Sequence, residues 1–242
     1  MTRFELTVHE PDGGRTPLVV APNRVYNLGS ATVDAEQALA HQNEVADVGV
    51  RIAFDIPAPR IYPMAVTSIT TDTEIGVHHE RTSGEAELVI VVSGGETYLG
   101  VGSDHTDRDL ETISIIWSKQ YCPSVLAPDV WRWRDVEAHW DELRLTSTVD
   151  GRAYQDSPAA VFRRPDDILK VLEDRVGELP AEYLVYCGTY TTIDNTIGFG
   201  DVWTATLADP VAGDELALSY RVTPLLAEIR DGYRVPLRPG AA

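Results

Sequence analysis

Short runs in which hydrophobic and polar residues alternate recur along most of this chain, and such runs predict β-strands. The first run is Phe4-Glu5-Leu6-Thr7-Val8, and a Gly13-Gly14 turn leads from it to a second apolar run over residues 17–21. Six further strands are predicted over residues 87–92, 97–102, 112–117, 143–149, 183–187 and 216–222. The chain is therefore expected to consist mainly of β-structure.

Two segments are instead predicted to be helices. The first begins at Asp34, a favourable N-cap with Gln37 three residues later, and runs through Val48 to a C-cap at Gly49. The second covers residues 165–175 and places its apolar side chains on one face.

Strands follow strands without helices between them, which argues against a purely parallel α/β architecture. We predict an α+β fold that is mostly β. Residues 1–65 are expected to form a small N-terminal part that carries the first helix, and residues 66–242 a sheet-rich body. No linker divides the chain cleanly, so the two parts can also form one continuous domain.

The 242 residues include 38 acidic and 20 basic ones, which gives a formal charge of −18. Phosphate backbones and anionic lipid repel such a chain, so binding to nucleic acid or a membrane surface is not expected. No apolar run approaches the roughly 20 residues that a membrane-spanning helix needs. The two cysteines, Cys122 and Cys187, lie far apart and form no metal or redox motif, so we expect reduced thiols and a cytoplasmic location.

Two glutamates, Glu85 and Glu87, lead into a strongly apolar strand and point to the same face of it. Gly94-Gly95 is a favoured two-residue hairpin turn, and the strand that follows it ends near Asp104. If these glycines form the loop, Glu85 lies opposite Asp104, with Glu87 diagonal to it on the same face. Three carboxylates at this spacing repel one another unless a cation lies between them.

Carboxylate oxygens are hard ligands, so such a site favours Mg²⁺ or Mn²⁺, with Ca²⁺ also compatible, over Zn²⁺. The alternative is a solvated strand edge at which Glu85 and Glu87 simply face water.

Several segments of this chain together resemble the fumarylacetoacetate hydrolase family. The matching segments are Gly84-Glu85-Ala86-Glu87-Leu88, residues 103–111 around Asp104 and Arg108, residues 118–123 around Lys119, residues 149–155 ending at Gln155, and Tyr186-Cys187-Gly188-Thr189. Their order and approximate spacing match from about residue 25 to residue 225. The Thr-Gly-Thr turn of the family is Cys187-Gly188-Thr189 here, so the chain resembles a divergent branch.

The resemblance implies a β-sandwich-like roll with a lid helix in the N-terminal part. It implies that Glu85, Glu87 and Asp104 bind the metal ion and that Lys119 stabilises an anion during catalysis. Three further positions match segments that bind substrate in the family, namely Arg108, Gln155 and Thr189.

His41 and Glu44 are three residues apart and share a face of the predicted first helix. Without the resemblance, His41 reads as a surface histidine. Hydrolases of the family carry such a pair on the lid helix, where the glutamate orients the histidine and the histidine activates water. The resemblance therefore assigns a catalytic role to both residues.

The function implied is metal-dependent hydrolysis of a carbon–carbon bond in a β-dicarbonyl, acylpyruvate-like acid, by a homodimer. Two alternatives stay open. The same metal site can serve a decarboxylase, dehydratase or isomerase of a 2-oxo acid, or the scaffold can bind a metal or metabolite without catalysis.

Overall fold

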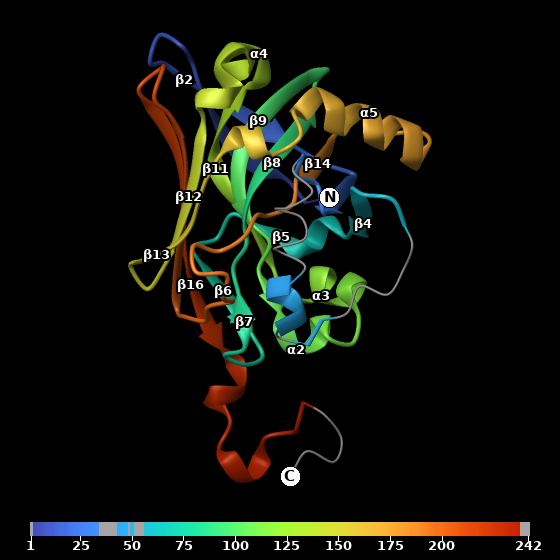
Figure 1. Cartoon of the computed structure of the whole chain (residues 1–242), viewed down its shortest axis with the longest axis vertical. Helices are drawn as coiled ribbons and strands as arrows, with labels where there is room; N and C mark the ends of the chain where they lie inside the picture. The colour runs from blue at the N-terminus through green and yellow to red at the C-terminus, as the bar shows by residue number, and fades with distance from the viewer. Residues whose placement is uncertain (1, 34–42, 48, 51–55, 238–242) are drawn as a thin grey trace.

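The computed structural model describes residues 2–33, 43–47, 49–50 and 56–237. Within these residues the strands form two large mixed sheets, and the α+β, mostly β fold class predicted from the sequence is confirmed. The five-stranded sheet lies against one side of the nine-stranded sheet (Figure 1). None of the described helices is both long and apolar enough to cross a membrane.

The nine-stranded sheet includes strands from both parts of the chain that the sequence analysis distinguished. Its order is β2-β1-β11-β9-β8-β14-β3-β4, with β5 paired to β11. The strands are β1 (Phe4–His9), β2 (Arg15–Val20), β3 (Arg24–Gly29), β4 (Arg60–Met64), β5 (Ile69–Thr70), β8 (Ala86–Ser93), β9 (Glu96–Ser103), β11 (Ser124–Arg132) and β14 (Tyr183–Tyr186). The pairs β1–β11, β14–β3 and β11–β5 are parallel, so segments distant in sequence are neighbours in the sheet.

The second sheet has the order β13-β12-β15-β16-β6. Its strands are β6 (Glu74–Val77), β12 (Arg144–Val149), β13 (Arg152–Pro158), β15 (Val202–Asp209) and β16 (Asp214–Pro224). A short ladder joins β7 (Thr82–Ser83) to β10 (Thr106–Asp107).

The helices are short, with one exception. They are α2 (Arg108–Glu111), α3 (Ile115–Tyr121), α4 (Trp133–Val136) and α5 (Pro165–Val176), and 3-10 turns span Val66–Ser68, Glu137–Glu142, Ala159–Val161, Leu225–Glu228 and Asp231–Tyr233. Helix α5 confirms the prediction for residues 165–175. Residues 43–47 are also helical, and Gly49 follows with φ +97° and donates its N–H to Ala46 O at 2.9 Å, as a C-cap does.

The strand predicted over residues 112–117 is wrong, because this segment leads into helix α3. Ser114 is the N-cap, and its side-chain hydroxyl accepts a hydrogen bond from Trp117 N–H. The apolar residues there suggested a strand, whereas the cap starts a helix that carries Lys119.

The hairpin register predicted from Gly94-Gly95 is confirmed. Both glycines have positive φ, and β8 pairs with β9 from Ser93↔Glu96 to Ala86↔Ser103. The pairing continues one residue further, where Asp104 N–H donates to Glu85 O at 3.0 Å.

Two hydrophobic clusters lie on the two faces of the nine-stranded sheet. The larger one fills the space against the five-stranded sheet and includes Leu88 and Ile90 from β8. The smaller one contains Val89 and Val91, the other face of the same strand. Glu87 shares the face of Val89 because side chains alternate along a strand, so the acidic residues lie at the end of the smaller cluster.

Gly102 in β9 offers a direct test of this packing. An added Cβ would lie 2.7 Å from Val89 Cγ2 and 2.8 Å from both Tyr186 Cε1 and Val125 O. We expect Gly102→Ala to lower the free energy of unfolding by about 1–3 kcal/mol, as overpacking does. Gly100→Ala is the matched control in the same strand, because its nearest neighbour is the Val130 side chain at 3.2 Å. Equal losses in urea unfolding would contradict this packing.

Candidate metal centre

Three carboxylates converge at the end of the β8–β9 hairpin, as the register predicted. Glu85 lies just before β8, Glu87 lies within it, and Asp104 follows β9. One ligand oxygen from each lies within 4.8 Å of the other two, and all three side chains are buried. Among the described residues this is the one such group of potential metal ligands.

The backbone between the two glutamates is held in place by residues from other elements. Gln155 Oε1 accepts from Ala86 N at 3.1 Å, and Thr189 Oγ1 donates to Ala86 O at 3.0 Å. The N–H of Gly188 donates to Glu87 Oε2 at 2.9 Å. Two of the residues expected to bind substrate, Gln155 and Thr189, thus contact the backbone between Glu85 and Glu87.

Two cations compensate part of the negative charge. Lys119 Nζ donates to Glu85 Oε2 at 3.0 Å and also forms an ion pair with Asp104. The guanidinium of Arg108 is fully buried and donates to Glu85 Oε1 at 2.9 Å and to Glu111 Oε2 at 2.7 Å. Its third contact is Ser83 Oγ, so this side chain is enclosed by protein groups.

The charges do not balance within this cluster. Four buried carboxylates, those of Glu85, Glu87, Asp104 and Glu111, face the two buried cations. Burial, and then the neighbouring Asp104, raise the pKa of Glu87 well above its ordinary range. Burial also raises the pKa of Asp104. Such shifts indicate that the site lacks positive charge, and a divalent cation would supply the missing two units.

Two further polar groups near the cluster have no hydrogen-bond partner among the described residues. Asn27 is buried and lies close enough to Asp104 to oppose, in small part, the rise in the pKa of that carboxyl. Even so, neither amide atom of Asn27 meets hydrogen-bond geometry. The Tyr186 hydroxyl is likewise unpartnered, and burial, Glu87 and Asp104 raise its pKa. Unpaired buried groups are costly, and a hydrated cation would give both of them a partner. The residues present therefore fit a divalent metal ion.

A small cavity of about 50 Å³ adjoins the centre. It is lined by Glu85 and Lys119 from the charged cluster, by Val45 from the helical segment 43–47, and by Arg60 and Tyr62 from β4. Arg60 and Tyr62, and Asn27 in the cluster itself, were not predicted from the sequence as site residues. No local motif marks them, because each comes from a strand that tertiary pairing brings to the site.

The predicted helix pair is described only in part. His41 lies outside the described residues. Glu44 is buried, and its Oε1 accepts hydrogen bonds from both the N–H and the hydroxyl of Thr192, each at 2.7 Å.

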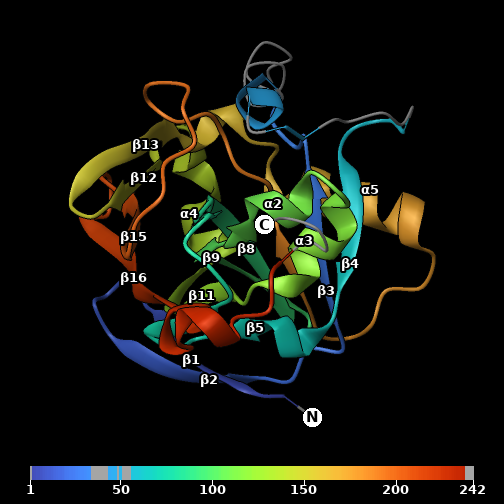
Figure 2. The same cartoon turned by 90° about the horizontal axis from the view of Figure 1, so that it is seen from below.

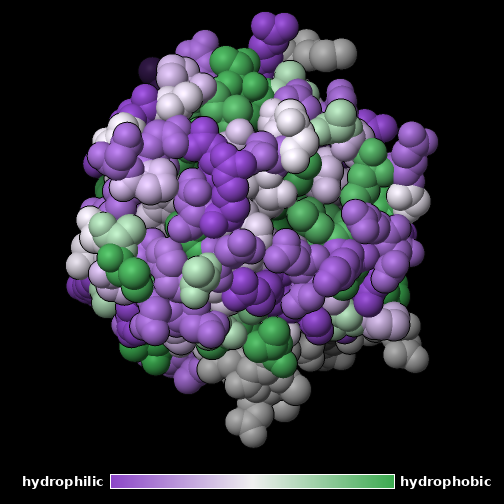
Figure 3. All heavy atoms as spheres, turned by 90° about the horizontal axis from the view of Figure 1, so that it is seen from above, coloured by the Kyte–Doolittle hydropathy of each residue, from purple (hydrophilic) through white to green (hydrophobic). Residues whose placement is uncertain are grey.

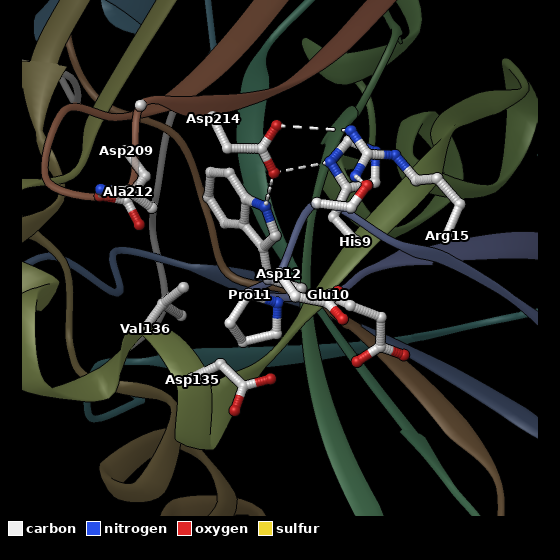
Figure 4. Close-up of a pocket in the computed structure, with 13 residues that line it drawn as sticks. His9, Glu10, Pro11, Asp12, Arg15, Asp135, Val136, Asp209, Ala212 and Asp214 are labelled. Atoms are coloured by element: carbon white, nitrogen blue, oxygen red, sulfur yellow. Dashed lines mark hydrogen bonds and ion pairs between the residues drawn. The ribbon is translucent and has the colours of Figure 1, made fainter.

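A larger cavity of about 350 Å³ lies elsewhere, between the β1–β2 and β15–β16 turns, and contains none of the predicted site residues (Figure 4). The main polar groups that line this cavity form hydrogen bonds or ion pairs with one another. Asp214 accepts from Trp131 Nε1 at 2.8 Å and lies 2.7 Å from His9 Nδ1, and Arg15 is within 3.6 Å of the same carboxylate.

Comparison with known proteins defines the class of this fold. The sequence model described as "Protein of unknown function (DUF2848)" matches residues 29–220, so the chain belongs to that family. No curated protein matches the sequence.

Solved structures of the fumarylacetoacetate hydrolase family and its relatives share the fold, which confirms the resemblance at that level. Fumarylpyruvate hydrolase from Pseudomonas aeruginosa, solved with Mn²⁺ and pyruvate, is 21% identical, with a TM-score of 0.60 over 92% of this chain and 96% of that one. A yeast fumarylacetoacetate hydrolase family protein is 13% identical, with a TM-score of 0.60 over 83% and 93%. A 2-keto-3-deoxyarabinonate dehydratase is 18% identical, with a TM-score of 0.57 over 84% and 74%.

The pair formed by His79 and Asp107 holds the N-terminus of α2, next to Arg108. His79 Nε2 lies 3.0 Å from Asp107 Oδ2, and Asp107 Oδ1 accepts from Leu110 N–H as the N-cap of α2. The hydrogen bond to Asp107 raises the pKa of His79 above 6.5, against the effect of burial. Burial acts to raise the pKa of Asp107, but the bonds from His79 and Leu110 outweigh it and lower this pKa below 3.8.

These shifts predict a pH dependence of stability in both directions. The stabilisation from His79 is complete below pH 6.5 and is lost as the pH rises through its raised pKa. The stabilisation from Asp107 is present above pH 3.8 and is lost as the pH falls through its lowered pKa. We expect His79→Gln to remove the alkaline loss in urea unfolding, whereas the exposed neighbour His78→Gln should keep it. The same alkaline loss in both variants would disprove the assignment.

Metal binding to the carboxylate cluster should be visible as thermal stabilisation, because a ligand that binds only the folded state raises its stability. Saturating Mn²⁺ or Mg²⁺ is expected to raise the melting temperature of the parent protein. Glu87→Gln should lose most of this rise, since it removes one ligand charge while keeping the side-chain shape. Glu137→Gln, at an exposed position, is the control and should respond like the parent. A rise of the same size in all three proteins would indicate nonspecific screening of the negative charge.

Proposed function

We propose that this protein is a divalent-metal-dependent enzyme that hydrolyses a carbon–carbon bond in a β-dicarbonyl, acylpyruvate-like acid. The observation that carries the proposal is the buried Glu85, Glu87 and Asp104 cluster, which lies beside a charged lysine and next to a cavity. The Mn²⁺-bound fumarylpyruvate hydrolase of the same fold supports both the metal and the substrate class.

When bound at the three carboxylates, Mg²⁺ or Mn²⁺ would act as a Lewis acid toward the oxo and carboxylate oxygens of the substrate. Lys119 supplies a fixed positive charge at the same place. Burial lowers its pKa, but Asp104 and Glu85 raise it further, so the amine stays protonated and can stabilise the anion left by bond cleavage.

We assign His41 the role of the base that takes a proton from water, with Glu44 orienting its ring. What supports this role is the position of the helical segment 43–47, whose Val45 lines the cavity beside Glu85 and Lys119.

The three residues expected to bind substrate receive positioning roles in this proposal. Arg108 is enclosed by Ser83, Glu85 and Glu111 and holds Glu85 in place. Gln155 and Thr189 hold the backbone of Ala86 between the two glutamate ligands. Their direct contact with substrate stays a prediction of the family resemblance.

A second reaction class is favoured by two observations. The Glu44 carboxylate already accepts two hydrogen bonds from Thr192, and a 2-keto-3-deoxyarabinonate dehydratase shares the fold. A decarboxylase, dehydratase or isomerase of a 2-oxo acid would use the same metal and Lys119 without needing activated water.

The role of Lys119 can be tested with a panel of acylpyruvates and oxaloacetate, assayed with added Mn²⁺ or Mg²⁺ and with a chelator. We expect metal-dependent turnover that Lys119→Met reduces by about 10²–10³-fold, the usual cost of a lost anion-stabilising group. Lys170→Met removes an exposed lysine on α5 and should leave the rate unchanged. Metal binding with no turnover of any compound would instead favour a binding protein.

The variant His41→Ala distinguishes the two reaction classes. Loss of a general base typically costs about 10²–10⁴-fold in rate, so hydrolysis of an acylpyruvate should fall by that amount while the metal-induced rise in melting temperature persists. Decarboxylation of oxaloacetate needs no attacking water and should change much less. Unchanged acylpyruvate hydrolysis in this variant would rule out the water-activating role.

A further inference from the structure

The cavity of about 350 Å³ shown in Figure 4 is separate from the metal centre, and we call it the acidic cavity. Its lining comes from the β1–β2 turn, from α4 and from the β15–β16 turn, which lie at the upper end of Figure 1. Trp131, near the end of β11, also lines it, whereas Ser124 at the start of that strand donates to Asp104 of the metal centre at 3.2 Å. The view from below instead shows α2 and α3, which carry the two cations of the metal centre (Figure 2).

Negative charge dominates the lining of the acidic cavity. The face at this end of the molecule is mainly hydrophilic when it is seen from above (Figure 3). Among the described residues that form the lining, five are acidic and two are basic, namely Glu10, Asp12, Asp135, Asp209 and Asp214 against His9 and Arg15. A cleft lined mainly by charge of one sign concentrates ligands of the opposite sign.

Two of the five carboxylates have an arginine as a close partner. Arg132 forms an ion pair with Glu10, and Arg15 lies 3.6 Å from Asp214. The Asp214 carboxylate also lies 2.7 Å from His9 Nδ1. These two carboxylates are therefore compensated within the protein, and the other three determine what the cavity can bind.

Asp12 and Asp135 are the more weakly compensated carboxylates of the rim. Asp12 is exposed, and its Oδ1 accepts the N–H of Gly14, a neutral donor, at 2.9 Å. Asp135 lies 3.9 Å from Arg134 Nε, but this arginine is 61% exposed and pairs more closely with Glu96, at 2.9 Å. Both carboxylates can therefore pair with a cation that enters the cavity.

Asp209 is the buried carboxylate of the lining, and one of its oxygens is unpartnered. The residue is only 1% exposed. Its Oδ1 accepts from the N–H groups of Val211 and Ala212, each at 3.0 Å, and lies 3.1 Å from His139 Nδ1. Its Oδ2 has no hydrogen-bond partner in the part of the chain that the structure describes. A buried carboxylate oxygen without a partner is costly, so this side of the cavity calls for a positively charged donor.

The spread of the carboxylates argues against a metal ion in the acidic cavity. Three ligand atoms within 4.8 Å of one another occur among the described residues only at the metal centre. In Figure 4 the carboxylates of Asp135, Asp209 and Asp214 lie on different sides of the cavity. An elongated cation with charges at separate positions matches this arrangement better than a single point charge.

The hydrogen-bond donors of the lining are already in use. Arg15 donates to Gly14 O at 3.1 Å, and the N–H of Ala212 donates to Asp209. A ligand with a carboxylate of its own would meet these occupied donors and the acidic side chains beside them. The lining therefore favours a pure cation over a zwitterion such as a free amino acid.

Apolar groups complete the lining and indicate the body of this cation. They are Pro11, Trp131, Val136 and Ala212. An aliphatic stem packs on such groups while its charged end reaches a carboxylate, as the side chains of lysine and arginine do. The cavity volume of about 350 Å³ is in the range of roughly 300–1,000 Å³ that small-molecule sites occupy.

We propose that the acidic cavity binds a linear aliphatic diamine or polyamine. One protonated amine pairs with Asp209, and a second faces Asp12 and Asp135 at the rim, so that charge-assisted hydrogen bonds form at both ends. The methylene chain between the amines packs on the apolar part of the lining. This site is distinct from the metal centre and does not depend on the proposed reaction.

The test measures binding of putrescine and spermidine to the full-length protein by isothermal titration calorimetry. Mg²⁺ is present to fill the carboxylate cluster, and about 0.15 M salt screens the net negative charge. One amine molecule is expected to bind per chain. Butylamine has the chain length of putrescine but one charge fewer, so it should bind about 10-fold or more weakly, as loss of a charged hydrogen bond predicts. Uncharged butanediol should not bind.

Substitutions distinguish the cavity from general surface charge. The double variant Asp12→Asn, Asp135→Asn should raise the Kd of putrescine by about 10-fold or more. Asp209→Asn keeps an oxygen that accepts the N–H groups of the turn, removes the charge, and should weaken binding by a similar factor. The double variant Asp167→Asn, Asp174→Asn removes two exposed charges from α5 and should leave the Kd unchanged.

Far-UV circular dichroism verifies that each variant is folded. If Asp209→Asn does not fold, the double variant of Asp12 and Asp135 decides the question by itself. Absence of saturable binding of both amines, equal affinity for butylamine and putrescine, or equal effects of the cavity and α5 variants would each overturn the proposal.

Discussion

The compensation of buried charge is the constraint on which the rest of this structure depends. Carboxylates buried without partners would cost several kcal/mol each, so cations must reach them wherever the fold places them. Arg108 and Lys119 come from two short helices after β9, and both contact Glu85. The segment between β9 and β11 is thus folded around the acidic cluster rather than around an apolar core.

This dependence explains why α2 and α3 differ from ordinary helices. Their inward sides carry Arg108, Glu111, Ser118 and Lys119, all of them polar. Charge pairing holds the helices against the sheet, while the apolar residues of α3 face outward. The same geometry that brings Lys119 to the carboxylates leaves these apolar side chains exposed.

The other side of the cluster is supported by residues that come from both sheets. Gln155 from β13 and Thr189 from the segment after β14 reach the backbone at Ala86, between the two glutamates. Both glutamates are therefore held through the backbone. Glu85 is also held by ion pairs with Arg108 and Lys119, and Glu87 by a hydrogen bond from Gly188 N–H. A site held from both sides is suited to binding an ion with defined geometry.

Local signals in the sequence determined the parts of the site that lie close together along the chain. The Gly94-Gly95 turn sets the β8–β9 register, and the alternation of side chains then puts Glu85, Glu87 and Asp104 on one face. The apolar spacing of α5 and the C-cap at Gly49 are local signals as well. The family resemblance added Lys119 and Arg108, which the structure places beside these carboxylates.

Only the tertiary structure decided the contacts that join distant segments. Strands β11 and β15 were not predicted, and the parallel pairing of β14 with β3 brings Asn27 near Asp104 across a long stretch of sequence. The apolar residues before Lys119 suggested a strand, although a single serine cap starts a helix there. Side-chain periodicity indicates which face of an element is apolar, but it does not indicate which residues will pack against that face. In α3 the inward face meets buried carboxylates, and the polar side chains that pair with them are therefore the ones that become buried.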